Sequence, residues 1–213
     1  MDMVKTLGSA GIIPVIVIDD IEKAVPLARA LVKGGLPVLE VTFRTACAAE
    51  AIAKIKAEVP GAILIAGTVL KMDQLVAAKA AGAEACVAPG FDPEIVNAAN
   101  RLGIPFCPGI ATASEMSQAL ALGCNMVKFF PAESAGGVKY IKDLLGAFRW
   151  TGVKIMPTGG VKLSNVSDYL AVPEIVCCGG TWIAPKDAVQ AGDWAKIEQL
   201  AADAAALVKT LRE

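Results

Sequence analysis

The sequence predicts an α/β fold, a (β/α)8 TIM barrel with a short N-terminal helix. Short apolar runs rich in β-branched residues alternate with Ala/Leu/Lys/Glu stretches of helical character along the whole chain. Eight such units in 213 residues give about 27 residues per unit, slightly more compact than a typical barrel of this class. A doubly wound open sheet is the structural alternative, and eight units in series favour closure over an open edge.

The candidate strands are short apolar runs that follow one another at regular spacing. They cover Ile13–Ile18, Pro37–Thr42, Ala62–Ala66, Ala85–Ala88, Pro105–Pro108, Met126–Phe129, Lys154–Pro157 and Ile175–Cys178. Runs of this length suit strands that are buried on both faces, as in parallel sheets covered by helices.

Helical segments lie between these runs, and the first ten residues predict a leading helix that covers the N-terminal end of the barrel. The helices are expected near Ile21–Lys33, Cys47–Glu58, Met72–Ala81, Pro93–Arg101, Ala113–Leu122, Val138–Leu145, Ser164–Leu170 and Trp194–Leu211. Glycines precede several strands, where a left-handed residue readily ends the preceding helix. These are Gly34-Gly35, Gly82, Gly103, Gly123 and Gly152.

Composition limits the domain count and the classes of partner. No linker, charge block or low-complexity tract interrupts the alternation, so residues 1–213 are expected to form a single domain. Charged residues make up 19%, and the net charge is -1, so nothing attracts nucleic acid or an anionic membrane surface. No apolar run approaches the roughly 20 residues of a membrane span. The mean hydropathy of +0.56 indicates buried parallel strands, a subunit interface, or both.

The six cysteines show no C-x-x-C spacing, and the chain has no histidine to complete a zinc site. No metal and no cofactor are therefore expected. The N-terminus lacks a signal-peptide pattern, so the cysteines are interpreted as reduced core residues of a cytoplasmic protein.

Lys128 is the most informative residue, because it lies in the apolar run Met126–Phe130. An ammonium among Val and Phe loses the hydration that favours its charged form, so a usable fraction of free amine is expected. A free amine attacks carbonyl carbons, which makes imine formation with a keto substrate the first functional hypothesis. The alternative is a lysine whose head group reaches water from the end of a strand.

Glu40 is the candidate proton carrier in a chain without histidine. Strand alternation places residues 38, 40 and 42 on one face, and burial there favours the protonated carboxyl group. Such a group takes and gives protons near neutrality. The alternative is a structural ion pair of Glu40 with Arg44 or Lys128. Arg44 follows by four residues and offers a guanidinium fork for a carboxylate, or else is a solvated loop charge.

Other uncommon residues fall at the ends of the predicted strands, where βα loops of a barrel carry the reactive groups. They are Thr68, Pro89-Gly90, Pro108-Gly109, Thr158-Gly159-Gly160 and Gly179-Gly180-Thr181. The last two glycine turns suit a phosphate site because backbone N–H groups approach an anion there; plain tight turns are the alternative. Core packing is the default interpretation for Phe130 and Trp182.

At these residues the chain resembles the 2-keto-3-deoxy-6-phosphogluconate (KDPG) aldolase family over nearly its full length. The motifs that carry the resemblance are Pro14–Val17, Val38–Thr45, Ala66–Leu70, Ala88–Gly90, Pro108–Ile110, Val127–Glu133, Pro157–Gly160 and Gly179–Trp182. The strand-two motif and K-F-F-P-A are specific, whereas the glycine turns are not.

The resemblance implies a homotrimer of barrels that cleaves a phosphorylated keto-deoxy sugar acid to pyruvate and D-glyceraldehyde 3-phosphate, with 4-hydroxy-2-oxoglutarate as a second substrate. By motif, Lys128 matches the imine-forming lysine and Glu40 the general acid and base. The pyruvate end matches Arg44, Thr68, Pro89, Phe130 and Thr158, and the phosphate end Gly159, Gly160, Gly180 and Thr181. Thr181 stands where serine is common and Phe43 where leucine is usual.

Two other functions stay open at this point. A phosphosugar isomerase or epimerase without a metal would use a carboxylate base on the same barrel and would have no need of Lys128. A sugar-phosphate sensor or other non-catalytic barrel would keep the anion site alone. Pyruvate-dependent inactivation by borohydride separates the imine chemistry from both.

Overall fold

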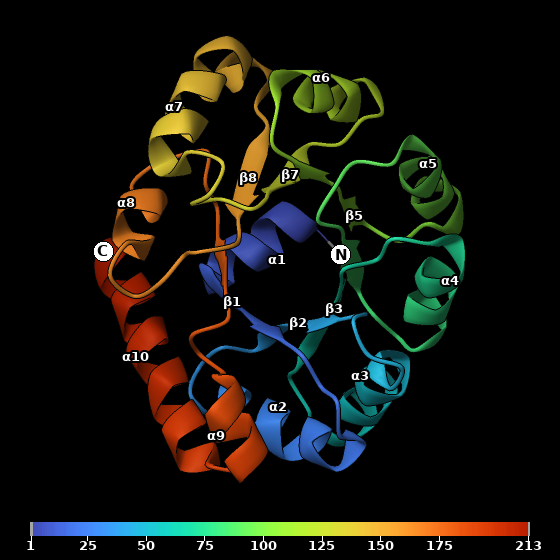
Figure 1. Ribbon diagram of the computed structural model, residues 1–213, viewed down its shortest axis with the longest axis vertical. Coiled ribbons are helices and arrows are strands. Elements are labelled where there is room, and N and C mark those ends of the chain that lie inside the picture. Colours follow the sequence, from blue (N-terminus) through green and yellow to red (C-terminus); the bar gives the residue numbers. More distant parts are fainter. Residues whose placement is uncertain (1, 213) are drawn as a thin grey trace.

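Parallel strands surround the centre of the molecule, and helices pack on their outer side (Figure 1). The computed structural model describes residues 2–212, so the two ends of the predicted domain, residues 1 and 213, lie outside the described part. The strands are β1 (Ile12–Ile16), β2 (Val38–Thr42), β3 (Ile63–Gly67), β4 (Ala85–Val87), β5 (Phe106–Cys107), β6 (Gly109–Ile110), β7 (Met126–Phe129), β8 (Lys154–Pro157) and β9 (Cys178–Gly180).

These strands form two parallel sheets. One has six strands in the order β5-β4-β3-β2-β1-β9, and the other has three in the order β6-β7-β8. Two isolated parallel bridges, Ile155 with Ile175 and Thr158 with Gly179, join the β8 segment to the chain around β9. The prediction of an α/β fold with a curved parallel sheet is confirmed.

The sheets depart from the predicted eight strands in two places. Pro108 separates β5 from β6, because proline has no N–H for the ladder, although the Lys128 N–H still donates to the Pro108 carbonyl at 2.8 Å. The last strand lies at Cys178–Gly180 rather than at Ile175–Cys178, and Ile175 keeps only a bridge. Its two glycines pair with Ile13 and Pro14 of β1, and neighbouring side chains occupy the space that a Cβ atom would need at either position.

The helices largely match the predicted segments. They are α1 (Met3–Ala10), α2 (Ala24–Lys33), α3 (Ala48–Glu58), α4 (Met72–Ala80), α5 (Pro93–Leu102), α6 (Ala113–Ala121), α7 (Gly137–Phe148), α8 (Val166–Leu170), α9 (Lys186–Ala191) and α10 (Trp194–Arg212), with 3-10 turns at Ile21–Lys23 and Arg149–Thr151. The sequence analysis missed α9, a helix of six residues.

Local signals fix where α5 and α6 begin. Asp92 accepts hydrogen bonds from the N–H groups of Glu94 and Ile95, and Pro93 occupies the first turn of α5. Thr112 and Glu115 form a capping box at the start of α6. α5 therefore begins shortly after Pro89-Gly90, which follow β4, and α6 begins shortly after β6.

The strands are buried on both faces, and the apolar residues divide into two layers. Leu39, Leu64 and Val127 belong to the outer layer packed against the helices. The inner layer lies between the strands and includes Val38, Ile65, Ala85, Val87, Met126 and Met156. This two-sided burial explains the near-continuous apolar runs of the sequence.

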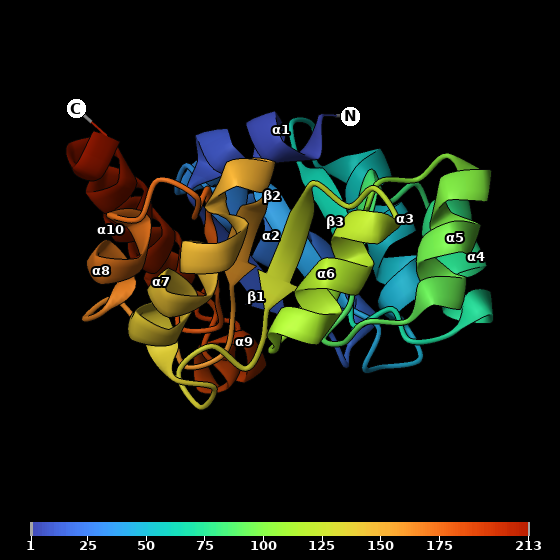
Figure 2. The same ribbon diagram turned by 90° about the horizontal axis from the view of Figure 1, so that it is seen from above.

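The predicted leading helix is present as α1 and lies across the middle of the strands in the view of Figure 1; Figure 2 shows it along one side of the molecule. Its Met3 and Leu7 are buried in the inner layer with Val38 and Met126, the first residues of β2 and β7. The helix therefore covers the amino ends of the strands, as predicted. From α10, Arg212 donates to the carbonyls of Gly8 and Val176 and fixes this arrangement.

Five of the six cysteines are buried and all six are free thiols, as predicted for reduced core residues. Burial raises the pKa of the Cys86 thiol to about 12, so this thiol is unreactive at neutral pH. No helix formed by residues 2–212 is long and apolar enough to cross a membrane.

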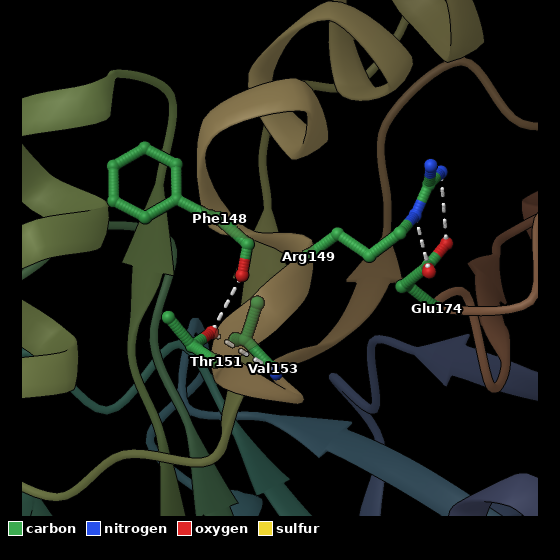
Figure 3. A network of polar contacts seen from close by, with 5 residues as sticks. All are labelled: Phe148, Arg149, Thr151, Val153 and Glu174. Atoms are coloured by element: carbon green, nitrogen blue, oxygen red, sulfur yellow. Dashed lines mark hydrogen bonds and ion pairs between the residues drawn. The ribbon is translucent and has the colours of Figure 1, made fainter.

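A partly buried ion pair connects the end of α7 to the segment before β9 (Figure 3). Arg149 Nε donates to Glu174 Oε1 at 2.7 Å, and its Nη2 lies 3.5 Å from Oε2. Beside it, the Thr151 hydroxyl donates to the Phe148 carbonyl and accepts from the Val153 N–H. The hydrogen bond from Arg149 holds the pKa of the Glu174 carboxyl group below its ordinary value.

Glu174→Gln is therefore expected to lower the free energy of unfolding at pH 7 by about 1 kcal/mol. A carboxyl group whose pKa is lowered in the folded state contributes its stability above the unfolded pKa of about 4.3 and loses it as the pH falls through the folded value. The difference between the two proteins should thus shrink on acidification, as measured by urea unfolding between pH 7 and pH 4.

The exposed pair Lys33–Glu198 provides the control for this measurement, since the Lys33 side chain is 74% exposed. Glu198→Gln should change stability less, because an exposed ion pair contributes little. Equal losses in both variants, independent of pH, would contradict a specific role for the Arg149–Glu174 pair.

Candidate active site

Lys128 and Glu40 form a buried ion pair between two strands that lie 88 residues apart in the sequence. Lys128 Nζ lies 2.7 Å from Glu40 Oε1, with Lys128 3% exposed and Glu40 fully buried. β7 places the lysine and β2 the glutamate, and Glu40 lies on the same strand face as Val38 of the inner layer. The snorkelling alternative for Lys128 is therefore wrong, and of the two pairings considered for Glu40 the structure has the one with Lys128.

The end of β3 lies so close to the Glu40 side chain that it limits where the carboxylate can lie. A Cβ atom on Gly67 would lie 2.5 Å from Glu40 Oε1 and 2.7 Å from its Cγ, which is far too close. Glycine at the end of β3 therefore leaves the space that the carboxylate occupies. The same strand end thus carries both the glycine that makes room for Glu40 and the next candidate residue, Thr68.

Two buried polar atoms among residues 2–212 have no hydrogen-bond partner: Glu40 Oε2 and Thr158 Oγ1. Thr158 follows β8 two residues after Met156, which pairs in register with Lys128. Leaving such an atom unsatisfied costs about 1–3 kcal/mol, so buried orphans are rare outside functional sites. A ligand beside the ion pair would supply the missing hydrogen bonds.

Arg44 and Thr68 come together at the ends of β2 and β3. Arg44 Nε donates to Thr68 Oγ1 at 3.3 Å. Thr68 has a φ of 56°, a left-handed conformation that β-branched residues rarely adopt and that costs of order 1–3 kcal/mol. The strain turns the threonine hydroxyl towards the arginine, and the exposed guanidinium keeps donors available for a carboxylate.

Phe130 follows β7 and Pro89 follows β4, so both lie just beyond the carboxyl ends of strands. Lys128 Nζ lies 5.8 Å from the centroid of the Phe130 ring, within range of a cation–π contact. Pro89 follows β4 and packs on β6 so closely that a Cβ atom on Gly109 would lie 2.2 Å from the Pro89 carbonyl carbon. No polar contact within the described residues links Pro89 to the ion pair, so its predicted role stays a prediction.

The two glycine turns lie side by side because Thr158 bridges Gly179. Gly159 and Gly160 have φ values of 98° and 81°, which favour glycine. A Cβ atom on Gly180 would lie 1.7 Å from the Trp182 ring, so the indole covers this glycine. Thr181, which lies between Gly180 and Trp182 in the sequence, is exposed.

Sequence reasoning missed a brace behind the Thr158–Gly160 turn. The hydroxyl group of Tyr169 on α8 donates to Glu133 Oε1, and the Glu133 N–H donates to the Gly159 carbonyl at 3.0 Å. Burial, which is the larger cause, and the hydrogen bond to Glu133 both raise the pKa of the Tyr169 hydroxyl group above its ordinary value. No sequence signal distinguished this tyrosine, because an aromatic residue in a short amphipathic segment is typical of core packing.

The arrangement can therefore bind a carbonyl compound covalently: a nucleophilic nitrogen and a carboxyl group lie within one hydrogen bond of each other, away from water. Arg44 follows β2 and Gly159-Gly160 follow β8, so both lie at the carboxyl ends of the parallel strands, as Lys128 near the end of β7 does.

Several known proteins are similar to this chain over most of its length. The family model described as KDPG and KHG aldolase matches residues 3–200. The 2-dehydro-3-deoxy-phosphogluconate aldolase of Pseudoalteromonas atlantica is 47% identical over 195 residues, which cover 92% of this chain and 90% of that protein. The KHG/KDPG aldolase of Escherichia coli strain K12 is 46% identical over 198 residues, which cover 93% of this chain and 92% of that protein.

Two solved structures share the fold with a TM-score of 0.90. One is the KDPG aldolase of Zymomonas mobilis ZM4 with 3-phosphoglycerate, 42% identical, covering 97% of this chain and 96% of that chain. The other is the KDPG aldolase of Legionella pneumophila with pyruvate captured at low pH as a covalent carbinolamine intermediate, 39% identical, covering 95% of this chain and 98% of that chain. On the family match and these identities, the chain belongs to the KDPG and KHG aldolase family.

Proposed function

We propose that this protein is a class I aldolase that cleaves 2-keto-3-deoxy-6-phosphogluconate to pyruvate and D-glyceraldehyde 3-phosphate through an imine on Lys128. The observation that carries the proposal is the buried Lys128–Glu40 pair at 2.7 Å. Transfer of one proton from the ammonium to the carboxylate turns this pair into a nucleophile and an acid in a single step. The carbinolamine in the Legionella relative supports this chemistry.

The reaction proceeds in steps that use only these two groups and water. Lys128 Nζ attacks the C2 ketone, one proton passes from the nitrogen to the former carbonyl oxygen, and Glu40 then gives its proton to the resulting hydroxyl group, which leaves as water. The protonated imine then accepts the electron pair of the C3–C4 bond while Glu40, through a water molecule, removes the proton of the C4 hydroxyl group. The aldehyde departs, Glu40 returns that proton to C3 of the enamine, and water hydrolyses the imine to release pyruvate and Lys128.

The two ends of the substrate carry different anions, and the site offers a different surface to each. Arg44, Thr68, Pro89, Phe130 and Thr158 form the pyruvate end in this proposal, supported by the Arg44–Thr68 hydrogen bond and by the unpartnered Thr158 hydroxyl group. Gly159, Gly160, Gly180 and Thr181 form the phosphate end, supported by the left-handed glycines of the first turn.

The proposal extends to the architecture and the assembly. In this proposal the chain forms a single domain, and its two sheets form one closed (β/α)8 barrel in which β5 and β6 together make one strand. The parallel bridge from Thr158 to Gly179 supports closure. The active form is a cytoplasmic homotrimer, supported by the family and by exposed apolar side chains such as Leu70 and Val76, each at least half exposed.

A second substrate, 4-hydroxy-2-oxoglutarate, shares the pyruvate half of the molecule and has a carboxylate in place of the phosphate end. The KHG/KDPG name of the Escherichia coli relative supports this pairing of substrates. An isomerase or epimerase without an imine would leave the buried lysine unexplained.

Purified protein supplied with the phosphorylated substrate should release pyruvate and D-glyceraldehyde 3-phosphate in equal amounts. Pyruvate release is followed through NADH oxidation by lactate dehydrogenase, and the aldehyde is measured separately. Isomerised substrate without pyruvate would favour the epimerase, and binding without turnover would favour the non-catalytic barrel.

A further inference from the structure

A cavity of about 490 Å³ lies next to the proposed phosphate end, between the carboxyl end of β1 and the segment that follows β9. Its first wall includes Val15, Val17 and Asp19, and its second wall includes Thr181, Trp182 and Lys186, the first residue of α9. Because Thr181 lines it, the cavity is continuous with the second glycine turn.

A hydrogen bond connects the segment after β1 to α9, the two parts of the chain that contribute to the walls. Lys23 Nζ, next to α2, donates to the carbonyl of Gln190 on α9 at 3.0 Å. Figure 1 shows the β1–α2 connection and α9 close together at the same side of the molecule. The space beside Thr181 is therefore part of the folded structure.

The charges in the cavity are few and unpaired. Of the residues that line it, Lys186 is the only cation and Asp19 the only anion. Within residues 2–212 neither side chain has a hydrogen-bond or ion-pair partner. The charges nearby are paired, Asp187 with Lys196 at 3.4 Å and Asp20 with Lys23 at 3.9 Å. Lys186 is thus available to an anion that enters the cavity.

Only two of the residues assigned to the site are cations, and neither is assigned to the phosphate end; Lys162, which follows the first glycine turn, is a second lysine near that end and does not line the cavity. Lys128 is paired with Glu40 and reacts at the ketone, and Arg44 lies with Thr68 at the other end. A phosphate held only by backbone N–H groups and a hydroxyl would lack a counter-charge.

We propose that Lys186 holds the phosphate group of the substrate from the far side of Thr181 and thereby sets the preference for phosphorylated over unphosphorylated substrates. Asp19 on the opposite wall weakens this preference by repulsion. The inference rests on the proposed function and adds to it the residue that selects the substrate class.

The test compares KM and kcat of Lys186→Met for the phosphorylated substrate and for 4-hydroxy-2-oxoglutarate. KM for the phosphorylated substrate should rise roughly fivefold with kcat unchanged, because an exposed charge pair is worth a modest free energy. KM for the unphosphorylated substrate should stay within experimental error. Asp19→Asn should lower KM for the phosphorylated substrate by roughly twofold. Circular dichroism of each variant checks that it is folded.

Two lysine variants serve as controls. Lys142→Met removes an exposed charge on α7, which lies at the other end of the molecule from α9 in Figure 1, and should leave both KM values unchanged. Lys162→Met removes the lysine that follows the first glycine turn without lining the cavity. A rise in KM for Lys162→Met with none for Lys186→Met overturns the proposal, as does an equal rise for both substrates in Lys186→Met.

Failure of the proposed function has a different signature. If the wild-type protein releases no pyruvate, the reaction assignment fails while the phosphate site is still testable. Binding of inorganic phosphate, followed by tryptophan fluorescence because Trp182 lines the cavity, should be several-fold weaker in Lys186→Met. Unchanged phosphate binding in that variant overturns the inference regardless of turnover.

Discussion

Lys128→Met is expected to abolish imine formation with pyruvate and to lower kcat by on the order of 10⁴-fold or more, because no other group can form the covalent intermediate. Wild-type protein treated with pyruvate and borohydride should carry a reduced adduct on the peptide that contains Lys128. Mass spectrometry of the digested protein locates this adduct. The variant should carry none.

The substitution also affects stability, because it leaves the buried Glu40 without its cation. Breaking a buried pair costs about 3–5 kcal/mol while the remaining group stays charged. Lys128→Arg avoids this problem, since its guanidinium keeps a positive charge beside Glu40 but does not form an imine. Both variants should be inactive, and thermal unfolding should show the larger loss for methionine. An adduct on a different lysine in either variant would reject the assignment.

Glu40→Gln is expected to keep imine formation, at a reduced rate, and to lower kcat by about 10²–10⁴-fold. Glutamine matches glutamate in shape and can still hydrogen-bond to Lys128, but it cannot transfer a proton. The carbinolamine must then lose water, and the C4 hydroxyl group its proton, with no positioned acid or base. Trapping rates with pyruvate and steady-state turnover separate the two effects.

Glu84→Gln is the matched control, because Glu84 lies in an ion pair with Lys56 at 2.6 Å on the outside of the strands. It should behave as the wild type in both assays. Full turnover in Glu40→Gln would remove this residue from the mechanism, and loss of trapping together with loss of folding would show that its role is structural.

The sequence could predict which side chains enter the site but not how they meet. Alternation in β2 placed Glu40 and Val38 on one face, and the structure has them there. The sequence left open whether Glu40 pairs with Arg44 or with Lys128, and the structure has it with Lys128. A side-chain contact over 88 residues depends on the relative position of β2 and β7, which belong to different sheets and whose placement no local pattern encodes.

The errors in the fold have a local cause of the same kind. Gly179 and Gly180 indicated a turn, because glycine usually ends regular structure. In the folded chain they belong to β9, where they pair with Ile13 and Pro14 of β1, and Thr158 and the Trp182 ring occupy the volume that a larger residue would need. The Tyr169–Glu133 brace went unnoticed for a similar reason, because only the folded chain brings its two residues together.

The position of α1 has a consequence for the order in which products leave. Because Met3 and Leu7 fill the space at the amino ends of the strands, substrate and products reach and leave Lys128 at the carboxyl ends of the strands. In the proposed mechanism the aldehyde departs while the three-carbon fragment is still covalently attached to Lys128. Pyruvate is therefore the last product to dissociate in cleavage and, by microscopic reversibility, the first reactant to load in synthesis.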